Sequence, residues 1–390
     1  MADIFLSYTH MDRPRARPIV EMLEDEGWSV WWDRGIEPGM EWLPELDQEL
    51  SNSRAVVVLW SEQSRDSEWV QKEAASGLAK GSLVPIVLDP DTIPERFSRH
   101  QATDLSRWKG EKHLTEIQTL LRRLASLVPP SRIDTVRPGY DPRFLGEDHE
   151  VPLPGVTGSA AVLRYNHFTV VMNPSRRLAH YSAYNVDGEH LMRIKRGRDD
   201  WAPDPLLPDS LQMELSLLKH SPYDRGHIMA RSTVSWGDPR KASISARQAF
   251  YWPNVAPQHE SLNRSRWLKL EQWEKAVATK HRRICGFSGP VFSDSDEPFR
   301  GELELEDGVI ALDTFRVPGA FWKVVVALSP DDELQLAAHL MEQTEVRRAD
   351  APRRKLSEYR VSLEDLERTT QLRFGPSLHG AAALDDGGRM

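Results

Sequence analysis

The residues that decide the larger part of the fold read SPYDRGHIMAR over Ser221–Arg231 and QAFYWPNVAPQHESLNRSRWLKLEQWEKAV over Gln248–Val277. Five side chains in these two pieces carry polar chemistry: Asp224, His227, Asn254, Asn263 and Glu271. A histidine, a neutral amide and a carboxylate are the groups needed to hold a hard divalent cation and to make water attack a phosphodiester. These residues by themselves predict a metal-dependent hydrolytic site, and we interpret the remaining chain as its support and control.

Apolar residues within the second piece recur at helical intervals, which predicts a helix over 261–278. Glu271 follows Asn263 by eight residues, about two helical turns, so both side chains project from the same side. The imidazole of His227 can accept a proton from water near neutral pH. Taken alone, His227 could equally be a core histidine, but the accompanying Asn263 and Glu271 favour the catalytic interpretation.

Short apolar runs around this region predict an α+β domain. We expect strands at 161–166, 168–173, 178–185, 283–289, 309–312 and 321–328, and a strand followed by a last helix within 355–374. In the last segment Ser362 stands three residues before Asp365, the spacing of a helix N-cap. We therefore expect domain boundaries at 1–128, 129–158 for a Pro- and Gly-rich linker or wrapping segment, 159–378, and 379–390 for a disordered tail.

Five sequence pieces in this module resemble the DNA/RNA non-specific endonuclease family, whose active site is a ββα-metal finger. They are HYSAYNV at 180–186, R-D-D-W-x-x-D-P at 198–205, YDRGHIMAR at 223–231, PNVAPQHESLNRSRWLKLE at 253–271 and YRVSLEDLERTTQLRF at 359–374. The DRGH core alone would be a weak match. The Asn, Pro-Gln, Asn and Glu that follow it at fixed spacing make the resemblance specific.

The resemblance implies a role for each polar residue. His227 would be the general base, Asn263 the amide ligand of Mg²⁺ or Mn²⁺, and Glu271 would orient a water on that ion. Arg198 would clamp a phosphate, although Arg193, Lys195 and Arg196 are neighbours and the register is open. Asp224 would support the site, and Asn254 would join the two segments by hydrogen bonds. Lys275 stands where relatives tend to carry arginine, so a bidentate contact is lost there.

The first third of the chain alternates strand and helix patterns, which predicts a parallel sheet flanked by helices. Strands are expected at 4–6, 28–32, 55–60 and 83–88, with helices at 13–26, 42–50, 68–78 and 110–127. Four pieces in register resemble a bacterial Toll/interleukin-1 receptor (TIR) domain, which implies a flavodoxin-like fold. They are DIFLSYTHMD at 3–12, WWDRGIEPGMEW at 31–42, AVVVLWSEQS at 55–64 and SEWVQKEA at 67–74.

Some TIR domains cleave NAD at the nicotinamide–ribose bond, and Glu73 matches their essential helix glutamate. By the same resemblance Tyr8 and Trp32 are expected to contact the nucleotide. A surface glutamate beside Lys72 is the alternative for Glu73, because many TIR domains only assemble. Core packing is the alternative for the tryptophans of the second strand.

Bulk properties limit the remaining possibilities. The net charge of −9 arises mainly from residues 1–130, while later basic clusters such as Lys280–Arg283 fit either a nucleic-acid backbone or ordinary solvated faces. The single cysteine, Cys285, together with the N-terminal sequence and the absence of long apolar runs, predicts a cytoplasmic protein that does not enter a membrane.

Three functional hypotheses follow. The first is an antiphage effector nuclease acting on double- or single-stranded DNA, with RNA as a second substrate. Its control would come from TIR-mediated homo-oligomers or filaments, or from an NAD-like or cyclic-nucleotide-type signal. The second is an NAD glycohydrolase that uses Glu73. The third is a scaffold in which both modules only bind, which the His–Asn–Glu set argues against.

Overall fold

The computed structural model describes residues 2–32, 44–111, 114–195, 201–305, 308–346 and 354–384. The chain divides into two compact units, Met1–Val136 and Arg137–Met390, both of mixed α/β structure. Within the described residues, no helix combines the length and the apolar character needed to cross a membrane.

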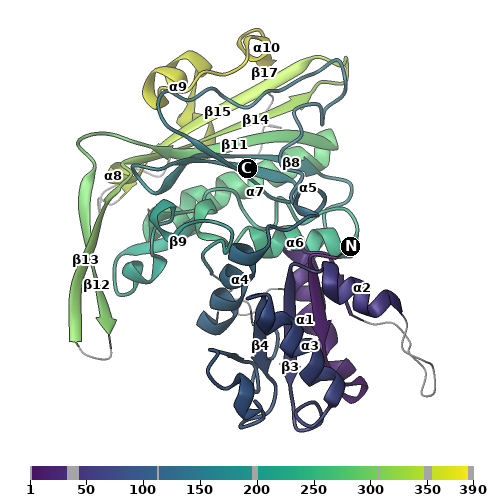
Figure 1. Ribbon diagram of the computed structural model, residues 1–390. Coiled ribbons are helices and arrows are strands. Elements are labelled where there is room, and N and C mark those ends of the chain that lie inside the picture. The colour runs from purple at the N-terminus through teal and green to yellow at the C-terminus, as the bar shows by residue number, and fades with distance from the viewer. Residues whose placement is uncertain are drawn as a thin grey trace. The chain divides into compact units, whose positions relative to one another are not determined.

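The first unit is built on a five-stranded parallel sheet with the order β2-β1-β3-β4-β5 (Figure 1). Its strands are β1 (Ile4–Ser7), β2 (Val30–Trp31), β3 (Ala55–Trp60), β4 (Leu83–Val87) and β5 (Thr103–Asp104). Its helices are η1 (His10–Asp12), α1 (Arg13–Asp25), α2 (Pro44–Asn52), α3 (Glu68–Ala79), η2 (Glu95–Phe97), α4 (Thr115–Leu127) and α5 (Ile133–Val136). The expected flavodoxin-like order is confirmed, and its switch point lies between β1 and β3.

Local sequence explains most of these elements. All six residues of β3 are buried, as expected for a central strand covered on both faces. Ser67 caps α3 by accepting a hydrogen bond from the amide of Val70. The strand expected over 28–32 is shorter than predicted, and β5 was not predicted because its two residues have no apolar pattern.

The second unit is built on a large, mainly antiparallel sheet with the order β16-β15-β14-β11-β8-β7-β6 and with β17 paired to β15. Its strands are β6 (Ala161–Arg164), β7 (Phe168–Asn173), β8 (Leu178–Asp187), β11 (Arg283–Val291), β14 (Ala320–Leu328), β15 (Leu334–Glu342), β16 (Arg360–Val361) and β17 (Ala382–Ala383). A separate hairpin is formed by β12 (Glu297–Leu305) and β13 (Gly308–Val317). The expected strands are present, but β12, β15 and β17 were missed.

The two faces of the large sheet carry different layers (Figure 1). One face packs on α7 (Leu268–His281) through a core that includes Trp267, Leu270, Trp273 and Phe321. The opposite face packs on α9 (Leu363–Thr370), α10 (Pro376–His379) and part of the segment 137–156, through a core that includes Phe287, Trp322 and Phe374. Alternate residues along each strand pack into the two opposite cores, which is the two-residue period of a sheet covered on both faces.

The described residues of this unit form further helices, most of them short. They are η3 (Asp209–Leu211), η4 (Leu215–Leu218), α6 (Pro239–Gln248), η5 (Trp252–Asn254), α8 (Gln343–Val346) and η7 (Leu356–Tyr359). Ser362 caps α9 as predicted, accepting from the amide of Asp365. The expectation of disorder from 379 onward is corrected by β17, which pairs in parallel with Gln335 and Leu336 of β15. Leu384 is fully buried there, so apolar contact extends the ordered chain.

Candidate active site

In the second unit, a β-β-α segment, the finger, carries most of the polar residues that the sequence predicted for the site. The strands β9 (Tyr223–His227) and β10 (Val255–His259) pair antiparallel, with His227 opposite Val255 and Asp224 opposite Gln258. A π-helix, η6 (Leu262–Trp267), follows and leads directly into α7. The sequence predicted one α-helix over 261–278, and this is corrected at its start. Wider π turns occur often at functional sites because they re-aim side chains.

His227 ends β9 and lies between two aromatic rings. Its ring centroid is 4.6 Å from that of Trp201 and 5.2 Å from that of Phe250, which meets it edge-on. The two flanking rings also contact each other, at 4.9 Å. These contacts fix the plane of the imidazole.

Asn254 is buried and makes four hydrogen bonds inside the protein. Its Oδ1 accepts from the amide of Met229 at 3.1 Å and from Ser182 at 2.9 Å. Its Nδ2 donates to the carbonyls of Met229 at 2.9 Å and Ala249 at 3.0 Å. With its hydrogen bonds used in this way, Asn254 fixes the chain that follows β9 against the segment that precedes β10.

Asp224 and Asn263 are brought together from β9 and η6. The Nδ2 of Asn263 donates to Asp224 at 2.9 Å, and Arg264 binds both carboxylate oxygens of Asp224, at 2.9 and 2.7 Å. Burial opposes ionisation of Asp224, but the hydrogen bonds from Arg264 and Asn263 outweigh it and lower its pKa. Because the amide nitrogen of Asn263 is engaged, its Oδ1 is oriented as the group available to a cation.

Glu271 lies on α7, two turns beyond Asn263. The pKa of its carboxyl group is raised to about 7, mainly by burial and less by the neighbouring Glu274, whereas Lys323 and the indole of Trp267 favour the charged form. A carboxyl group that titrates near neutral pH is suited to proton transfer and to orienting water.

Beneath Glu271 lies a buried cluster that the sequence did not reveal. Lys323 of β14 donates to Glu274 Oε2 and to Tyr184 Oη, both at 2.8 Å, and all three side chains are fully buried. One feature of the sequence could have revealed this cluster, because Lys323 is a single charge inside the apolar run AFWKVVVAL of β14. Charged residues are rarely buried without partners, so such a lysine predicts a buried acid.

Two other positions were singled out from the sequence, Arg198 and Lys275. Arg198, the expected phosphate clamp, lies outside the described residues. Lys275 is exposed on α7, one turn after Glu271.

Hard oxygen donors make the finger compatible with a divalent cation. Within the described parts of the chain there is no cluster of three or more His, Cys, Asp or Glu side chains with metal-site geometry. The donor expected from the sequence is instead a single amide oxygen, that of Asn263, with Glu271 further along the chain on α7. Few protein ligands and several waters suit Mg²⁺, which dehydrates reluctantly.

The first unit holds a second buried carboxyl group at the switch point of its sheet. Glu73 of α3 accepts a hydrogen bond of 2.5 Å from Ser7 at the end of β1, and only 8% of its surface is exposed. Burial raises its pKa to about 7, against the hydrogen bond from Ser7. Tyr8 directly follows Ser7, and its ring lies 6.2 Å from that of Trp32. The predicted Tyr8, Trp32 and Glu73 therefore lie at the carboxyl ends of neighbouring strands.

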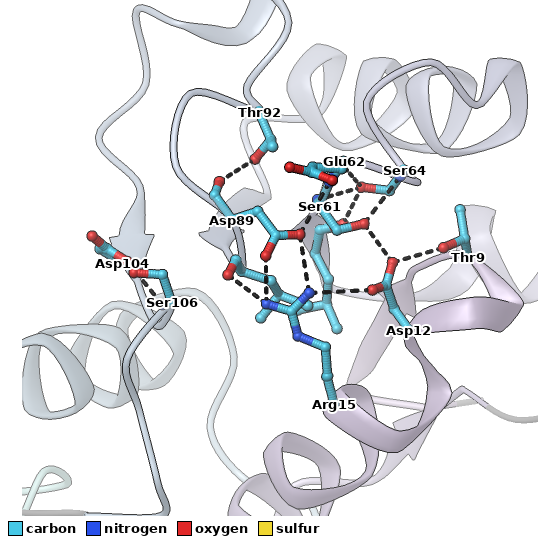
Figure 2. Close-up of polar contacts among 12 residues, drawn as sticks. Thr9, Asp12, Arg15, Ser61, Glu62, Ser64, Asp89, Thr92, Asp104 and Ser106 are labelled. Atoms are coloured by element: carbon cyan, nitrogen blue, oxygen red, sulfur yellow. Dashed lines mark hydrogen bonds and ion pairs between the residues drawn. The ribbon is translucent and has the colours of Figure 1, made fainter.

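A polar network fixes the loops at this edge of the sheet (Figure 2). Buried Asp12 accepts hydrogen bonds from Thr9, at 2.7 Å, and from Ser61. Arg15 binds both carboxylate oxygens of Asp89, at 3.0 and 2.9 Å, and approaches Asp12 at 3.5 Å. The chain segments that follow β1, β3 and β4 are thereby joined to one another.

Comparisons with known proteins identify the families that both parts of the chain resemble. A family model described as DNA/RNA non-specific endonuclease matches residues 148–380, and one described as TIR domain matches residues 4–121. The uncharacterized protein y4fB of Sinorhizobium fredii is 32% identical over 247 residues, which are 57% of this chain and 35% of that protein. Nuclease 1, mitochondrial, of Schizosaccharomyces pombe is 27% identical over 226 residues, 56% of this chain and 67% of that protein.

Endonuclease G, mitochondrial, of Homo sapiens is 27% identical over 158 residues, 40% of this chain and 50% of that protein. The chain thus spans about a third of the Sinorhizobium protein and half of the human one. A match to the crystal structure of the EndoG/EndoGI complex covers 56% of this chain and 87% of the matched chain, with 23% identity and a TM-score of 0.44. With most of its second unit matched by one family model, the chain belongs to the DNA/RNA non-specific endonuclease family, and a TIR domain precedes its nuclease domain.

Proposed function

We propose that the second unit is a divalent-metal-dependent nuclease that hydrolyses DNA, and RNA as a second substrate, without strong sequence preference. The observation that carries this proposal is the pairing of Asn263 with Asp224 on the strand that ends at His227. It orients an amide oxygen within a finger whose next helix carries Glu271. The description of the family as non-specific supports the lack of sequence preference.

The residues of the finger fit Mg²⁺ or Mn²⁺ through Asn263, with Glu271 holding a water of the ion's shell. When bound, the ion stabilises the charge that develops on the phosphorus oxygens and on the leaving oxygen. Asp224 keeps the Asn263 amide from rotating, so its oxygen stays directed toward the cation.

His227 is the group that activates the attacking water. It accepts the proton as the water oxygen forms a bond to phosphorus and the bridging P–O bond breaks. The flanking Trp201 and Phe250 rings hold the imidazole in one plane, which supports in-line attack. The ionised carboxylate of Glu271 accepts a hydrogen bond from a neighbouring water and fixes its orientation.

Plasmid and single-stranded RNA degradation with and without Mg²⁺ tests this proposal. We expect His227→Ala to reduce cutting at least about a hundredfold, in line with loss of a general base. His190→Ala is the matched control, because its side chain is 65% exposed and lies outside the finger. If His227→Ala cuts as fast as the parent protein, the assignment of the site fails.

We further infer that the TIR unit controls the nuclease through homo-oligomers or filaments, triggered by an NAD-like or cyclic nucleotide, in antiphage defence. The fusion of the two modules supports this, because an uncontrolled nuclease would degrade the DNA of its own cell. Cutting assays with NAD or cyclic dinucleotides, run alongside light scattering, test it. Faster cutting in step with larger particles is expected, and equal cutting by monomers would refute it.

NAD hydrolysis at Glu73 is the second candidate, favoured by the buried carboxyl group at the sheet's switch point. There the carboxylate would stabilise the ribosyl cation as the nicotinamide–ribose bond breaks and water adds to the ribose. Loss of NAD should disappear in Glu73→Ala and persist in Glu68→Ala, which changes an exposed residue of the same helix. No turnover in the assembled protein would leave the TIR unit with a purely regulatory role.

A further inference from the structure

A buried ion pair of the second unit lies outside the finger. Arg137 binds both carboxylate oxygens of Asp204, at 2.6 and 3.2 Å, and the two side chains are only 4% and 1% exposed. Tyr165 donates a further hydrogen bond to Asp204, at 2.8 Å. Arg137 directly follows α5 and is the first residue of the second unit, so the ion pair fixes the beginning of that unit.

Two aromatic rings cover the guanidinium group of Arg137. Its Cζ atom lies 5.1 Å from the ring centre of Tyr165 and 5.4 Å from that of Tyr251, close enough for cation–π contacts. Tyr165 is completely buried, and Tyr251 is nearly so. The ion pair is therefore enclosed, which strengthens the attraction between its charges and opposes the movement of either partner.

Asp204 belongs to a short segment, 201–204, that is also joined to the chain before β10. The amide of Ala202 donates to the carbonyl of Phe250 at 3.5 Å, and the carbonyl of Ala202 accepts from the amide of Trp252 at 3.0 Å. The segment is thus held at Ala202 by backbone hydrogen bonds and at Asp204 by the ion pair.

Trp201 opens this segment and contacts the proposed general base. Its ring centroid lies 4.6 Å from that of His227 and 4.9 Å from that of Phe250. Asp204 follows Trp201 by three residues, a span of at most about 11 Å of extended chain. Because the segment is so short, a displacement of Asp204 would move the Trp201 ring and with it the imidazole.

Stability alone is a weak explanation of the ion pair. Removing two charges from water is costly, and well-packed apolar residues of similar volume often stabilise a core equally well. Anchoring of the chain after α5 is the simpler role, and it predicts no effect on His227. The position of Asp204 in the segment that carries Trp201 favours a role at the site instead.

We propose that Arg137 is a positioning residue for the nuclease reaction: through its ion pair with Asp204 it holds the Trp201 ring against the imidazole of His227. This inference rests on the proposed nuclease function. The ion pair acts through Trp201 on the direction in which the imidazole faces the attacking water. It should therefore affect the rate of the chemical step and not the binding of DNA.

Kinetics of DNA cutting and nuclear magnetic resonance of His227 test this role together. The paired variant Arg137→Met with Asp204→Asn removes both charges and leaves no unpaired ion in the core. We expect kcat to fall about tenfold, with KM for DNA unchanged within about twofold. The ring signal of His227, assigned by its loss in His227→Ala, should move, because the ring currents of Trp201 and Phe250 depend on distance.

A second ion pair of the same unit provides the matched control. Arg176 lies 3.3 Å from Asp296, and their side chains are 16% and 3% exposed. Arg176→Met with Asp296→Asn should lower the midpoint of thermal unfolding, but leave the His227 signal and kcat per folded molecule unchanged. If the folded variant of Arg137 and Asp204 keeps the parent's His227 signal or kcat, the ion pair only anchors the chain and the inference is overturned.

Should the paired variant fail to fold, Arg137→Lys carries the test. Lysine keeps the positive charge but lacks the planar fork that binds both carboxylate oxygens. The His227 signal should again move, and kcat should fall about threefold, in line with the loss of one hydrogen bond. Arg176→Lys should change neither quantity. An unchanged His227 signal in Arg137→Lys would then refute the positioning role.

Failure of the proposed function is recognised separately. If the parent protein does not cut DNA with Mg²⁺, the nuclease proposal fails, while the His227 signal still reports whether Arg137 fixes the imidazole. A signal that moves in the paired variant and stays in the control variant supports the link from Arg137 to His227. A signal that moves in neither variant refutes that link.

Discussion

Glu73 and Glu271 are two carboxyl groups, in two different folds, whose pKa is raised to about 7. Burial raises the pKa of both groups, but the neighbouring residues that favour their charged forms differ. Glu73 has a hydroxyl partner, Ser7, and Lys72, a cation that favours its charged form, has a side chain 58% exposed to solvent. Lys323, the cation that favours ionised Glu271, is completely buried. A raised pKa thus reports burial, whereas the partners of the group determine how firmly its charge is fixed.

The finger should depend most on the amide that Asp224 orients. Asn263→Ala removes the oxygen donor while leaving His227 and Glu271 in place, and we expect cutting to fall at least about a hundredfold. NAD turnover by the TIR unit, if present, should not change, which separates the two carboxyl sites. Lys269→Ala, an exposed change on the same helix, is the control. Equal loss in both variants would mean that α7 is damaged generally.

Close packing between the finger strands should give the next largest effect. A Cβ atom at Gly226 would lie 2.2 Å from Gln258 Oε1 and 2.5 Å from its Cγ. Gln258 is fully buried, so its side chain cannot turn toward solvent. Gly226→Ala should lower the free energy of unfolding of the second unit by about 3 kcal/mol, measured by denaturant titration. Gly380→Ala, where nothing lies within 4 Å of a new Cβ, should be neutral.

The buried carboxyl group of the first unit should make its stability depend on pH. Because the pKa of Glu73 is raised from 4.5 to about 7, folding takes up a proton, and the stability that this group contributes is lost as pH rises through that window. Glu73→Gln cannot ionise, so it should raise the free energy of unfolding by roughly 2 kcal/mol at pH 8 and leave it unchanged near pH 4. Thermal unfolding at both pH values measures this, and a constant difference would contradict it.

The parts of this molecule that follow from short-range sequence patterns were predictable. The alternation of apolar strands and helices gave the parallel sheet of the first unit, and the cap at Ser362 was recognised from three-residue spacing. The apolar spacing also placed Asn263 and Glu271 on one helical segment, but that segment begins as the π-helix η6. Their catalytic roles, and that of His227, remain predictions.

Long-range pairing was not accessible from the sequence. Glu274 lies 49 residues before Lys323, and Tyr184 lies 139 residues before it, so their buried cluster exists only once β14, β11 and β8 are neighbours. The π turns of η6 were missed because they have the same apolar spacing as an α-helix over one or two turns. The lone lysine of β14 was a signal from which a buried acid could have been predicted, but it does not say which one.

The smallest effect is expected from removal of the Ser7 hydroxyl, which donates a hydrogen bond to Glu73. The hydrogen bond from Ser7 lowers the pKa of Glu73, so Ser7→Ala should raise that pKa and move the acid limb of any NAD hydrolysis upward, with about threefold less turnover at pH 6. Ser51→Ala, an exposed change on α2, should have no effect. The nuclease reaction of the same variant should keep its acid limb, because Ser7 belongs to the other unit. If instead the acid limbs of both reactions shift together, the two carboxyl groups are coupled. They are then not independent sites.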